Sequence, residues 1–242
     1  MNRTKIEWTD FTWNPITGCL HGCWYCYAKK YCVRFSKRYL ANPNVAPNCD
    51  PNNPFSPRFW SERLKEPYHM NHPSKIFACS ISDIFAPWTP IEWRDKVLDS
   101  IFNCPTRHTF QLLTKNPERI PPLNVYSDYV WVGTTVTGEN GDERNIEAIK
   151  KVNAKTKFVS FEPLLADVFR TPETQDEGMA LSLEGIQWVI IGKLTGSRKV
   201  KLEKRWIDNI WFEAQRCGVP VFFKNNLGIK DAVQEFPKEP RP

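Results

Sequence analysis

The sequence predicts an α/β fold with parallel strands, and three observations support this prediction. Short apolar runs rich in β-branched and aromatic residues recur along the chain, which is typical of buried strands. Segments with apolar residues three or four positions apart lie between these runs, as in amphipathic helices. Strands and helices that alternate along one chain favour a parallel sheet, which is either open or closed into a full or partial barrel.

Seven short runs are expected to be strands, because each is too short for a helix: residues 11–16, 75–81, 109–114, 130–136, 157–161, 187–192 and 219–223. Three segments have helical periodicity: residues 91–103, 141–153 and 203–217. Gly218 follows the last of these segments and is a natural helix stop.

Two stretches interrupt this alternation. Residues 42–57 contain five prolines and five asparagines, so we expect an extended surface loop there. Residues 170–184 are polar and aperiodic, as in an insertion, and residues 234–242 are expected to fray. Because βα units continue on both sides of the loop and the insertion, we expect a single domain over residues 1–242.

Composition limits the classes of protein that this chain can belong to. With 242 residues and 41% hydrophobic content, the chain can fill a substantial core. It has no run of about eighteen apolar residues and no signal-peptide centre, so we expect a cytoplasmic protein without a membrane partner. Eight cysteines are too few for a disulfide scaffold. The net charge of +6 gives modest support to a polyanionic substrate.

Polar residues follow nearly every expected strand. Each alone could cap a helix or form a turn, but together they predict a polar rim at the carboxyl edge of the sheet, where parallel α/β folds build their sites. The rim consists of Ser80, Ser82, Asp83, Thr114, Lys115, Thr134, Thr135, Ser160, Glu162, Gly192, Lys193, Lys224 and Asn225.

Three cysteines, Cys19, Cys23 and Cys26, lie within eight residues of one another. Thiolates this close repel one another unless a cation holds them, so zinc, an iron–sulfur cluster and plain burial are the alternatives. Structural zinc takes four ligands, commonly as two pairs, and would have to recruit His21, Cys32 or a distant cysteine here. Three thiolates on a four-iron cluster leave one iron open to a reactant.

The residues around the cysteines fit a cluster-binding loop. Gly18 and Gly22 allow the backbone to wrap closely, and the residues from Trp24 onward can start a helix that leaves the site. For His21 we favour a role in a turn over an approach to the cluster.

The spacing C-x3-C-x2-C, with Tyr25 before the third cysteine, resembles the signature of the radical S-adenosylmethionine superfamily. The resemblance implies a [4Fe-4S] cluster held by the three cysteines, with S-adenosyl-L-methionine bound to the open iron through its amino and carboxylate groups. It also implies an electron donor, either a reductase or a flavodoxin- or ferredoxin-type protein. The electron cleaves the sulfonium to methionine and a 5′-deoxyadenosyl radical, which abstracts a hydrogen atom from the substrate.

A wider resemblance extends over roughly residues 5 to 225. The chain is similar to a group of small, mostly phage- and prophage-associated proteins of unassigned function that carry a three-cysteine motif. The matching stretches are KIEWTDFTWNPITGC, CWYCYA, FSPRFW, SISDIF, FQLLTKNPERI, VWVGTTV, KFVSFEPLL and VPVFFKN. This resemblance implies a partial barrel of the (βα)6 type with the cluster after the first strand.

The chain departs from these relatives at two places. Many of them space the first two cysteines more widely, so the motif here is nearer the general superfamily form. Where relatives tend to end the sixth strand in Gly-Gly-Glu-Ser, this chain has Gly192-Lys193-Leu194-Thr195. A cation therefore replaces a carboxylate, which puts any role of that glutamate in doubt.

The superfamily resemblance implies roles for the residues that follow the strands and the motif. Tyr25 would lie near the adenine or pack over the cluster, and Ser80, Ser82 and Asp83 would hold the methionine ammonium or cap the next segment. Lys115 would balance the methionine carboxylate, and Thr135 or Ser160 would hold the ribose hydroxyls. Glu162 and Gly192 are further candidates for binding the cofactor. The candidates for binding a substrate phosphate are Lys193, Lys224 and Arg144. For Arg144, plain surface charge is an equal alternative.

The substrate class is less sharply indicated. The phage-type resemblance, the basic balance and the aromatic content favour a nucleobase, a nucleotide or a nucleic acid, while a peptide or a small metabolite stays open. Two alternatives to the enzyme remain: a zinc-stabilised nucleic-acid-binding module, and an iron–sulfur protein that binds S-adenosylmethionine without radical chemistry. No residue pattern indicates the reaction outcome or the oligomeric state.

Overall fold

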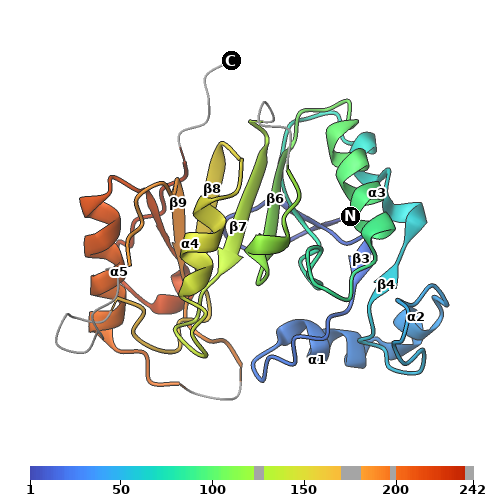
Figure 1. The fold of residues 1–242 in the computed structure, drawn as a ribbon, viewed down its shortest axis with the longest axis horizontal. Coiled ribbons are helices and arrows are strands. Elements are labelled where there is room, and N and C mark those ends of the chain that lie inside the picture. Colours follow the sequence, from blue (N-terminus) through green and yellow to red (C-terminus); the bar gives the residue numbers. More distant parts are fainter. Residues whose placement is uncertain (123–127, 170–180, 197–199, 238–242) are drawn as a thin grey trace. The chain divides into compact units, whose positions relative to one another are not determined.

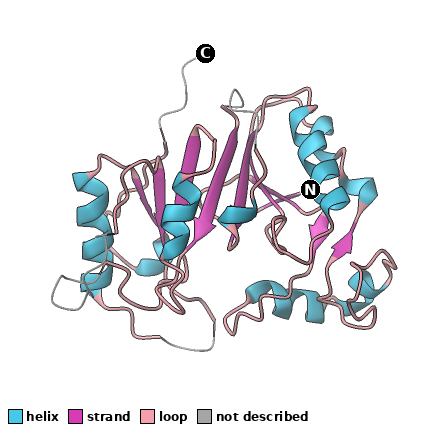
Figure 2. Ribbon diagram, in the orientation of Figure 1, coloured by secondary structure: helices cyan, strands magenta, loops and turns pink. Residues whose placement is uncertain are grey.

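The computed structural model describes residues 1–122, 128–169, 181–196 and 200–237, and the chain divides into two compact units, Met1–Thr114 and Lys115–Pro242 (Figure 1). In both units helices occur among strands (Figure 2). Among the described strand pairs, the first unit has two parallel and two antiparallel ones, and those of the second unit are parallel. The predicted α/β class is therefore confirmed. Within the described residues the longest helix has 13 residues, and none is long and apolar enough to cross a membrane.

The first unit contains a sheet whose strands run in the order β1-β2-β5-β6. These strands are β1 (Asn2–Arg3), β2 (Phe11–Trp13), β5 (Lys75–Ala78) and β6 (Thr109–Thr114). β2, β5 and β6 are parallel, and β1 pairs antiparallel with β2. Helix α3 (Ile91–Phe102) follows β5 and buries Trp93, Val97, Leu98 and Ile101, as its periodicity predicts.

The first predicted strand, residues 11–16, is interrupted in the structure. β2 ends at Trp13, and a separate strand, β3 (Ile16–Thr17), pairs antiparallel with β4 (Arg58–Phe59). Pro15 lies between them and has no N–H to donate to a strand partner, while its carbonyl accepts a hydrogen bond from the Trp60 N–H at 2.8 Å. The break therefore follows from the proline.

β5 is shorter than the predicted strand 75–81 because the backbone changes conformation directly after Ala78. Cys79 has a φ of +58°, in the left-handed region, and its carbonyl accepts a hydrogen bond from the Ser82 N–H at 3.0 Å. This turn redirects the chain after the strand, so Ser80 to Asp83 lie in a loop.

A small core anchors the segment after the cysteine motif. Helix α1 (Tyr27–Arg34) buries Ala28 and Cys32, and helix α2 (Ser36–Leu40) buries Tyr39. These side chains pack with Phe55 and Trp60, and Cys19, Cys26 and Ile81 pack against the same cluster. The predicted helix that leaves the motif is thus confirmed and begins at Tyr27.

Residues 42–57 form a loop, as predicted, but one folded around a buried side chain rather than extended over the surface. The Arg58 guanidinium is fully buried and donates to the carbonyls of Asn42, Asn53, Ser56 and Pro51 at 2.5 to 3.1 Å. These bonds compensate the desolvation of the guanidinium and give the proline-rich segment a defined path. Two short 3-10 helices, η1 (Ser61–Arg63) and η2 (Glu66–His69), follow it.

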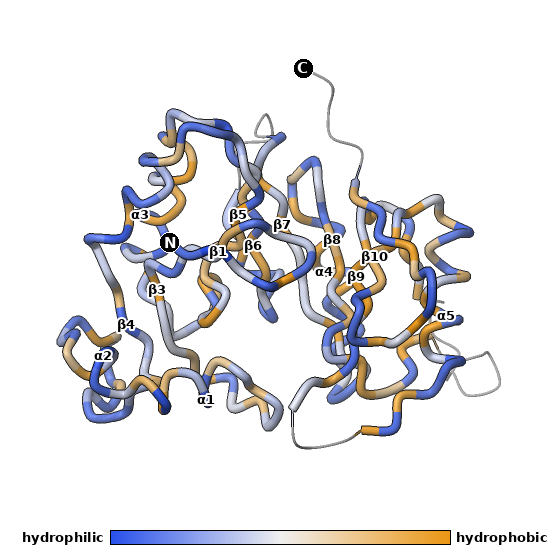
Figure 3. The backbone as a smooth tube through the Cα atoms, turned by 180° about the vertical axis from the view of Figure 1, so that it is seen from behind, coloured by the Kyte–Doolittle hydropathy of each residue, from blue (hydrophilic) through white to orange (hydrophobic). Residues whose placement is uncertain are grey.

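The second unit contains four parallel strands in the order β7-β8-β9-β10. Their bounds, Val130–Thr135, Thr156–Phe161, Trp188–Ile191 and Val221–Phe223, agree closely with the predicted runs. β7 and β9 are buried along their whole length, as expected for strands covered on both faces. Figure 3 shows the mostly hydrophobic character of β9 and β10.

The helices of the second unit agree with prediction in position and differ in length. α4 (Arg144–Lys150) is shorter than the predicted segment 141–153, and α5 (Lys204–Arg216) buries Ile207, Ile210 and Ala214. α4 lies against β7 and β8 (Figure 1). Two 3-10 helices, η3 (Pro117–Arg119) and η5 (Asn225–Leu227), complete the unit in its described part.

The C-terminal segment differs from the expected frayed tail over residues 234–237. The Glu235 N–H donates to the Val221 carbonyl at 3.0 Å, and Trp188 Nε1 donates to the Glu235 carbonyl at 2.8 Å. Phe236 stacks on Trp188 with ring centroids 5.3 Å apart. The remaining tail residues, 238–242, and most of the predicted insertion, 170–180, lie outside the described residues.

Candidate functional site

The loop that carries the three cysteines is held by backbone hydrogen bonds to two neighbouring segments. The Gly18 N–H donates to the Ile81 carbonyl and the Cys19 N–H donates to the Phe55 carbonyl, both at 3.1 Å. Gly18 has a φ of +84°, and a Cβ there would lie 2.6 Å from the Phe55 carbonyl oxygen. Only glycine therefore allows this close approach of the backbone.

Cys26 occupies the position that caps helix α1. Its Sγ accepts a hydrogen bond from the Lys29 N–H at 3.4 Å. Burial raises the pKa of Cys26, and the hydrogen bonds from Lys29 and Ala28 partly offset this increase. The helix terminus thus favours negative charge on a sulfur that its surroundings otherwise keep protonated.

The Cys19 thiol is affected electrostatically by the other two cysteines of the motif. Burial raises the pKa of Cys19 to about 12, and negative charge on Asp83, Cys23 and Cys26 contributes to the increase. All three cysteines are partly exposed rather than enclosed in the core. The thiolate forms of Cys19 and Cys26 are thus disfavoured unless a cation stabilises them, so the loop is suited to a positively charged occupant.

Two further cysteines lie near the motif, and their thiols form hydrogen bonds with other side chains. The Cys32 thiol is buried and hydrogen-bonded with Tyr39, and the Cys79 thiol is buried and hydrogen-bonded with Ser82. In the described residues no three His, Cys, Asp or Glu side chains converge on one point as ligands of a single metal ion. A four-iron cluster instead spreads its thiolates over separate irons, so three sulfur donors can serve such a cluster without converging on one point.

Asp83 is a buried carboxylate beside the cysteine loop. Its Oδ1 accepts from Thr114 Oγ1 at 2.6 Å and from the Phe85 N–H at 3.1 Å, while its Oδ2 lies 2.8 Å from His21 Nε2. The His21 ring in turn packs edge-on against Trp88. Asp83 therefore connects the loop that contains His21 to the ends of β5 and β6, and the bond to Phe85 agrees with the predicted capping role.

The two serines of the predicted ammonium-binding stretch point their hydroxyls at neighbouring chain segments. Ser80 Oγ donates to Asn14 Oδ1 at 3.1 Å, and Ser82 Oγ donates to the Ile16 carbonyl at 2.9 Å. As donors, both hydroxyls keep lone pairs that can accept from a ligand. Tyr25, the predicted adenine neighbour, is partly buried and packs its ring edge-to-face with Trp24 at 5.4 Å.

The second unit collects eight of the predicted rim residues at the carboxyl ends of its parallel strands: Thr134, Thr135, Ser160, Glu162, Gly192, Lys193, Lys224 and Asn225. Thr135 and Ser160 are buried register partners on β7 and β8. Because neighbouring parallel strands end at the same edge, the predicted rim is present in this unit.

An ion pair joins Glu162, after β8, to Lys224, after β10. Gly192 lies between them, and a Cβ there would be 3.0 Å from side-chain carbons of both residues. A larger residue at position 192 would therefore press on this pair. Lys193 is exposed, and its backbone exchanges hydrogen bonds with the Asn226 side chain at 3.0 and 3.2 Å.

Lys115 is joined to helix α4, whose first residue is Arg144, at another place in the second unit. The Asn145 side chain donates to the Lys115 carbonyl at 3.4 Å, which brings Lys115 next to the first turn of α4. Arg144 is the exposed first residue of that helix.

The sequence analysis missed Asn14, which connects the ends of two strands. Its Oδ1 accepts from Ser80 Oγ and from the Ile81 N–H at 3.2 Å, and its carbonyl accepts from Arg63 Nη1 at 3.0 Å. A signal was present, because Asn14 follows β2 as the other polar residues follow their strands. Because we expected one strand over residues 11–16, Asn14 was placed inside that strand and not after it.

A family model described as "Protein of unknown function (DUF5131)" matches residues 3–239. This span covers nearly the whole chain and includes every residue of the candidate site. No curated protein and no solved structure matches the chain.

Proposed function

This chain belongs to the DUF5131 family, and we propose that it is a radical S-adenosylmethionine enzyme whose [4Fe-4S] cluster is bound by Cys19, Cys23 and Cys26. The observation that carries the proposal is the cysteine loop, in which three partly exposed thiols lie within eight residues and helix α1 begins directly after the third. The two other thiols near it, those of Cys32 and Cys79, form internal hydrogen bonds. Three donors without a fourth leave one iron open for the cosubstrate.

When bound, the cluster and S-adenosylmethionine together supply the reductive cleavage of a sulfonium, and with it the abstraction of a hydrogen atom from a substrate. The electron would come from a reductase or a flavodoxin- or ferredoxin-type donor. Ser80, Ser82 and Asp83 would accept hydrogen bonds from the methionine ammonium. Tyr25 would lie near the adenine.

The strand ends of the second unit would orient the rest of the ligands. Thr135 and Ser160 would hold ribose hydroxyls, and Lys115 would balance the methionine carboxylate. The Glu162–Lys224 pair, packed around Gly192, supports a polar role for this edge. Lys193, Lys224 and Arg144 carry the positive charge that a substrate phosphate requires.

The fold, substrate and location that accompany this proposal follow from the sequence. The parallel strands would form a partial barrel of the (βα)6 type. The substrate would be a nucleobase, or a nucleotide free or in a nucleic acid. Thiolates that bind a cluster must stay reduced, which favours the cytoplasm.

Anaerobic reconstitution with iron and sulfide tests the cluster. We expect about four irons with matching sulfide per chain, and loss of both in Cys19→Ala, Cys23→Ala or Cys26→Ala. Cys104→Ala is the matched control, because Cys104 is also partly exposed in the first unit but lies outside the motif. About one zinc per chain without iron would instead establish a zinc-stabilised module and overturn the proposal.

The second step of the test adds S-adenosylmethionine and dithionite to the reconstituted protein. We expect 5′-deoxyadenosine in the wild type and in Cys104→Ala, and none in the three motif variants. A protein that holds the cluster and binds S-adenosylmethionine but forms no 5′-deoxyadenosine would be an iron–sulfur protein without radical chemistry.

A further inference from the structure

The first unit contains a cavity of about 410 Å³. Of its lining residues, Ser80 alone has a role in the proposed chemistry. Its walls come from β1, β2, α1, α2 and the loop after β5. We name it the Arg–Tyr pocket, and its main lining residues are Arg38, Arg63, Tyr27, Tyr31, Asn14 and Ser80. Small-molecule sites in proteins are typically clefts of roughly 300–1,000 Å³. The cavity is therefore large enough for a ligand of that size.

The pocket has an excess of positive charge. Arg3, Arg38 and Arg63 line it, and in the described part of the chain none of these guanidinium groups forms an ion pair with a carboxylate. Glu66, the single carboxylate of the lining, is paired with the amino group of Met1. The pocket therefore suits a ligand that brings its own negative charge.

Arg38 and Arg63 line the same pocket, and the charge on Arg38 acts on Arg63. Burial and the charge on Arg38 lower the pKa of Arg63, and Glu66 and Glu62 oppose this decrease. Each guanidinium group presents a planar fork of donors that matches a phosphate. An anion between them would relieve their repulsion.

Three tyrosines, Tyr27, Tyr31 and Tyr39, line the pocket, and further aromatic rings outside the lining pack near Tyr31 and Arg63. Tyr31 lies with its ring centroid 4.8 Å from Phe35 and 6.5 Å from Tyr39, and the Arg63 guanidinium lies 3.8 Å above the Trp60 ring. Tyr27 and Tyr31 are four residues apart on α1, so they share one side of the helix, and both are exposed. Exposed aromatic rings beside cationic groups are the arrangement on which proteins stack nucleobases.

Polar groups close the remaining side of the pocket. The Tyr27 hydroxyl donates to the Ser80 carbonyl at 2.5 Å, and the Ser80 hydroxyl donates to Asn14 Oδ1. The amide nitrogen of Asn14 has no protein partner in the described residues, so it remains a donor for a ligand. The wall thus offers both a donor and acceptors to the edge of a base.

We propose that the Arg–Tyr pocket binds a nucleotide, with its phosphate between Arg38 and Arg63 and its base stacked on Tyr31 within reach of Asn14. The shared chemistry is one base with one phosphate, whether the nucleotide is free or part of a single strand. This inference goes beyond the proposed reaction, because binding here needs neither a cluster nor S-adenosylmethionine.

Calorimetric titration of the full chain tests the proposal. The probes are the four nucleoside 5′-monophosphates, adenosine, inorganic phosphate and a short single-stranded oligothymidylate. We expect at least one monophosphate or the oligonucleotide to bind about tenfold or more tightly than both adenosine and inorganic phosphate. Binding by a monophosphate identifies a free nucleotide, and binding by the oligonucleotide alone identifies a strand.

Two variants connect the binding to the pocket. Arg38→Gln and Tyr31→Leu should each weaken the bound probe about tenfold, because Arg38 and Tyr31 are exposed and can be changed without opening the core. Arg34→Gln is the matched control, since Arg34 is exposed on the last turn of α1 but does not line the pocket. It should change the affinity less than about twofold.

Several outcomes would overturn the inference: no probe binds, adenosine or phosphate binds as tightly as the nucleotide, or Arg34→Gln weakens binding as much as Arg38→Gln. The same titration with Cys19→Ala separates this inference from the proposed enzyme. A variant without the cluster that still binds the nucleotide supports the pocket, whatever the outcome of reconstitution.

Discussion

Single residues decide the path of the cysteine loop, and Gly18 shows this most directly. Its amide and that of Cys19 bind two carbonyls from different parts of the first unit, and its φ of +84° lies in the region that side chains disfavour. Gly22, in the same loop, has a φ of +68°, but no atom lies within 4 Å of the position of a Cβ there. Substitution of Gly22 therefore tests backbone strain alone, whereas substitution of Gly18 tests strain and steric contact together.

We predict that Gly18→Ala lowers the free energy of unfolding by about 3 kcal/mol, because left-handed strain and overlap with Phe55 and Ser56 add together. Gly22→Ala should cost about 1 kcal/mol, from the strain alone. Urea unfolding of both variants measures the difference. Equal decreases in the free energy of unfolding of the two variants would show that the contact of Gly18 with the loop around Arg58 does not contribute to stability.

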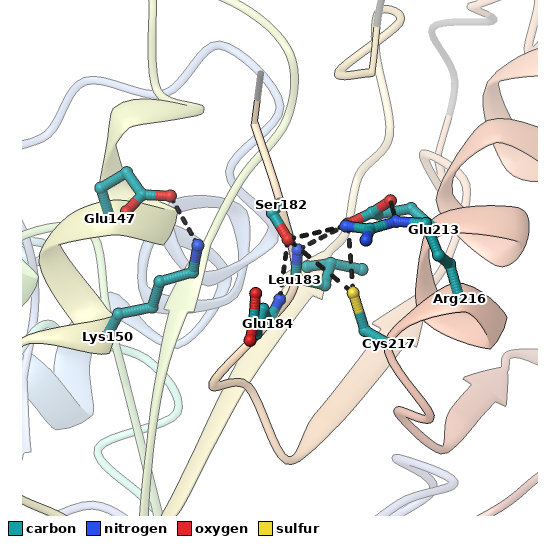
Figure 4. A network of polar contacts seen from close by, with 8 residues as sticks. All are labelled: Glu147, Lys150, Ser182, Leu183, Glu184, Glu213, Arg216 and Cys217. Atoms are coloured by element: carbon teal, nitrogen blue, oxygen red, sulfur yellow. Dashed lines mark hydrogen bonds and ion pairs between the residues drawn. The ribbon is translucent and has the colours of Figure 1, made fainter. Parts of the chain in front are cut away.

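At the scale of elements, helix α5 is tied to the segment before β9 by one carboxylate (Figure 4). Glu213 accepts from the Leu183 N–H at 3.0 Å, from Arg216 Nη2 at 2.7 Å and from the Cys217 thiol at 3.2 Å. Burial by itself raises the pKa of Glu213, but hydrogen bonds from Arg216, Leu183, Cys217 and Ser182 lower it to about 2. The charged form is thus the one that joins the two elements.

This shift predicts a pH dependence with a definite sign. A folded-state pKa of about 2, below the ordinary 4.5, stabilises the fold above pH 4.5, and this stability is lost as the pH falls towards 2. Glu213→Gln should lower the free energy of unfolding by about 1 kcal/mol at pH 7, after allowance for solvent screening, and by less at pH 3.

Urea unfolding of both proteins at pH 7, 5 and 3 measures this difference. Glu147→Gln removes the partly exposed Glu147–Lys150 ion pair of α4, also drawn in Figure 4, and should change stability by less than about 0.5 kcal/mol. A Glu213→Gln deficit that does not shrink at low pH would contradict the assignment.

At the scale of the whole molecule, the end of the described chain belongs to the core of the second unit. The Phe236 ring lies 5.3 Å from the rings of both Trp188 and Phe222, and the Gln234 side chain donates to the Phe223 carbonyl at 3.1 Å. Residues 234–237 thus complete the packing of β9 and β10.

Truncation after Val233 should lower the free energy of unfolding by about 3 kcal/mol, because it exposes the Trp188 ring and leaves its Nε1 without the Glu235 carbonyl. Truncation after Pro237 keeps all these contacts and should leave stability within about 0.5 kcal/mol of the full chain. Thermal unfolding of both proteins provides the measurement. If the chain truncated after Val233 were as stable as the full chain, residues 234–237 would not contribute to stability.

The positions of most strands and helices could be predicted from the sequence because periodicity is local. Alternation and helical spacing depend on residues within a few positions, and the runs at 109–114, 130–136 and 157–161 became β6, β7 and β8 nearly residue for residue. The errors came where single residues act on the backbone, as at Pro15 and Cys79.

By itself, the sequence determined the parallel α/β class, the order of the elements and the spacing of the three thiols. Only the tertiary structure decided that Arg58 is buried among four carbonyls, that His21 meets Asp83, and that Arg38 and Arg63 share a pocket with Tyr31. The partners in each of these contacts include residues many positions apart, whose approach depends on how whole elements pack. Local pattern carries no information on that packing, so this chemistry becomes visible only once the chain is folded.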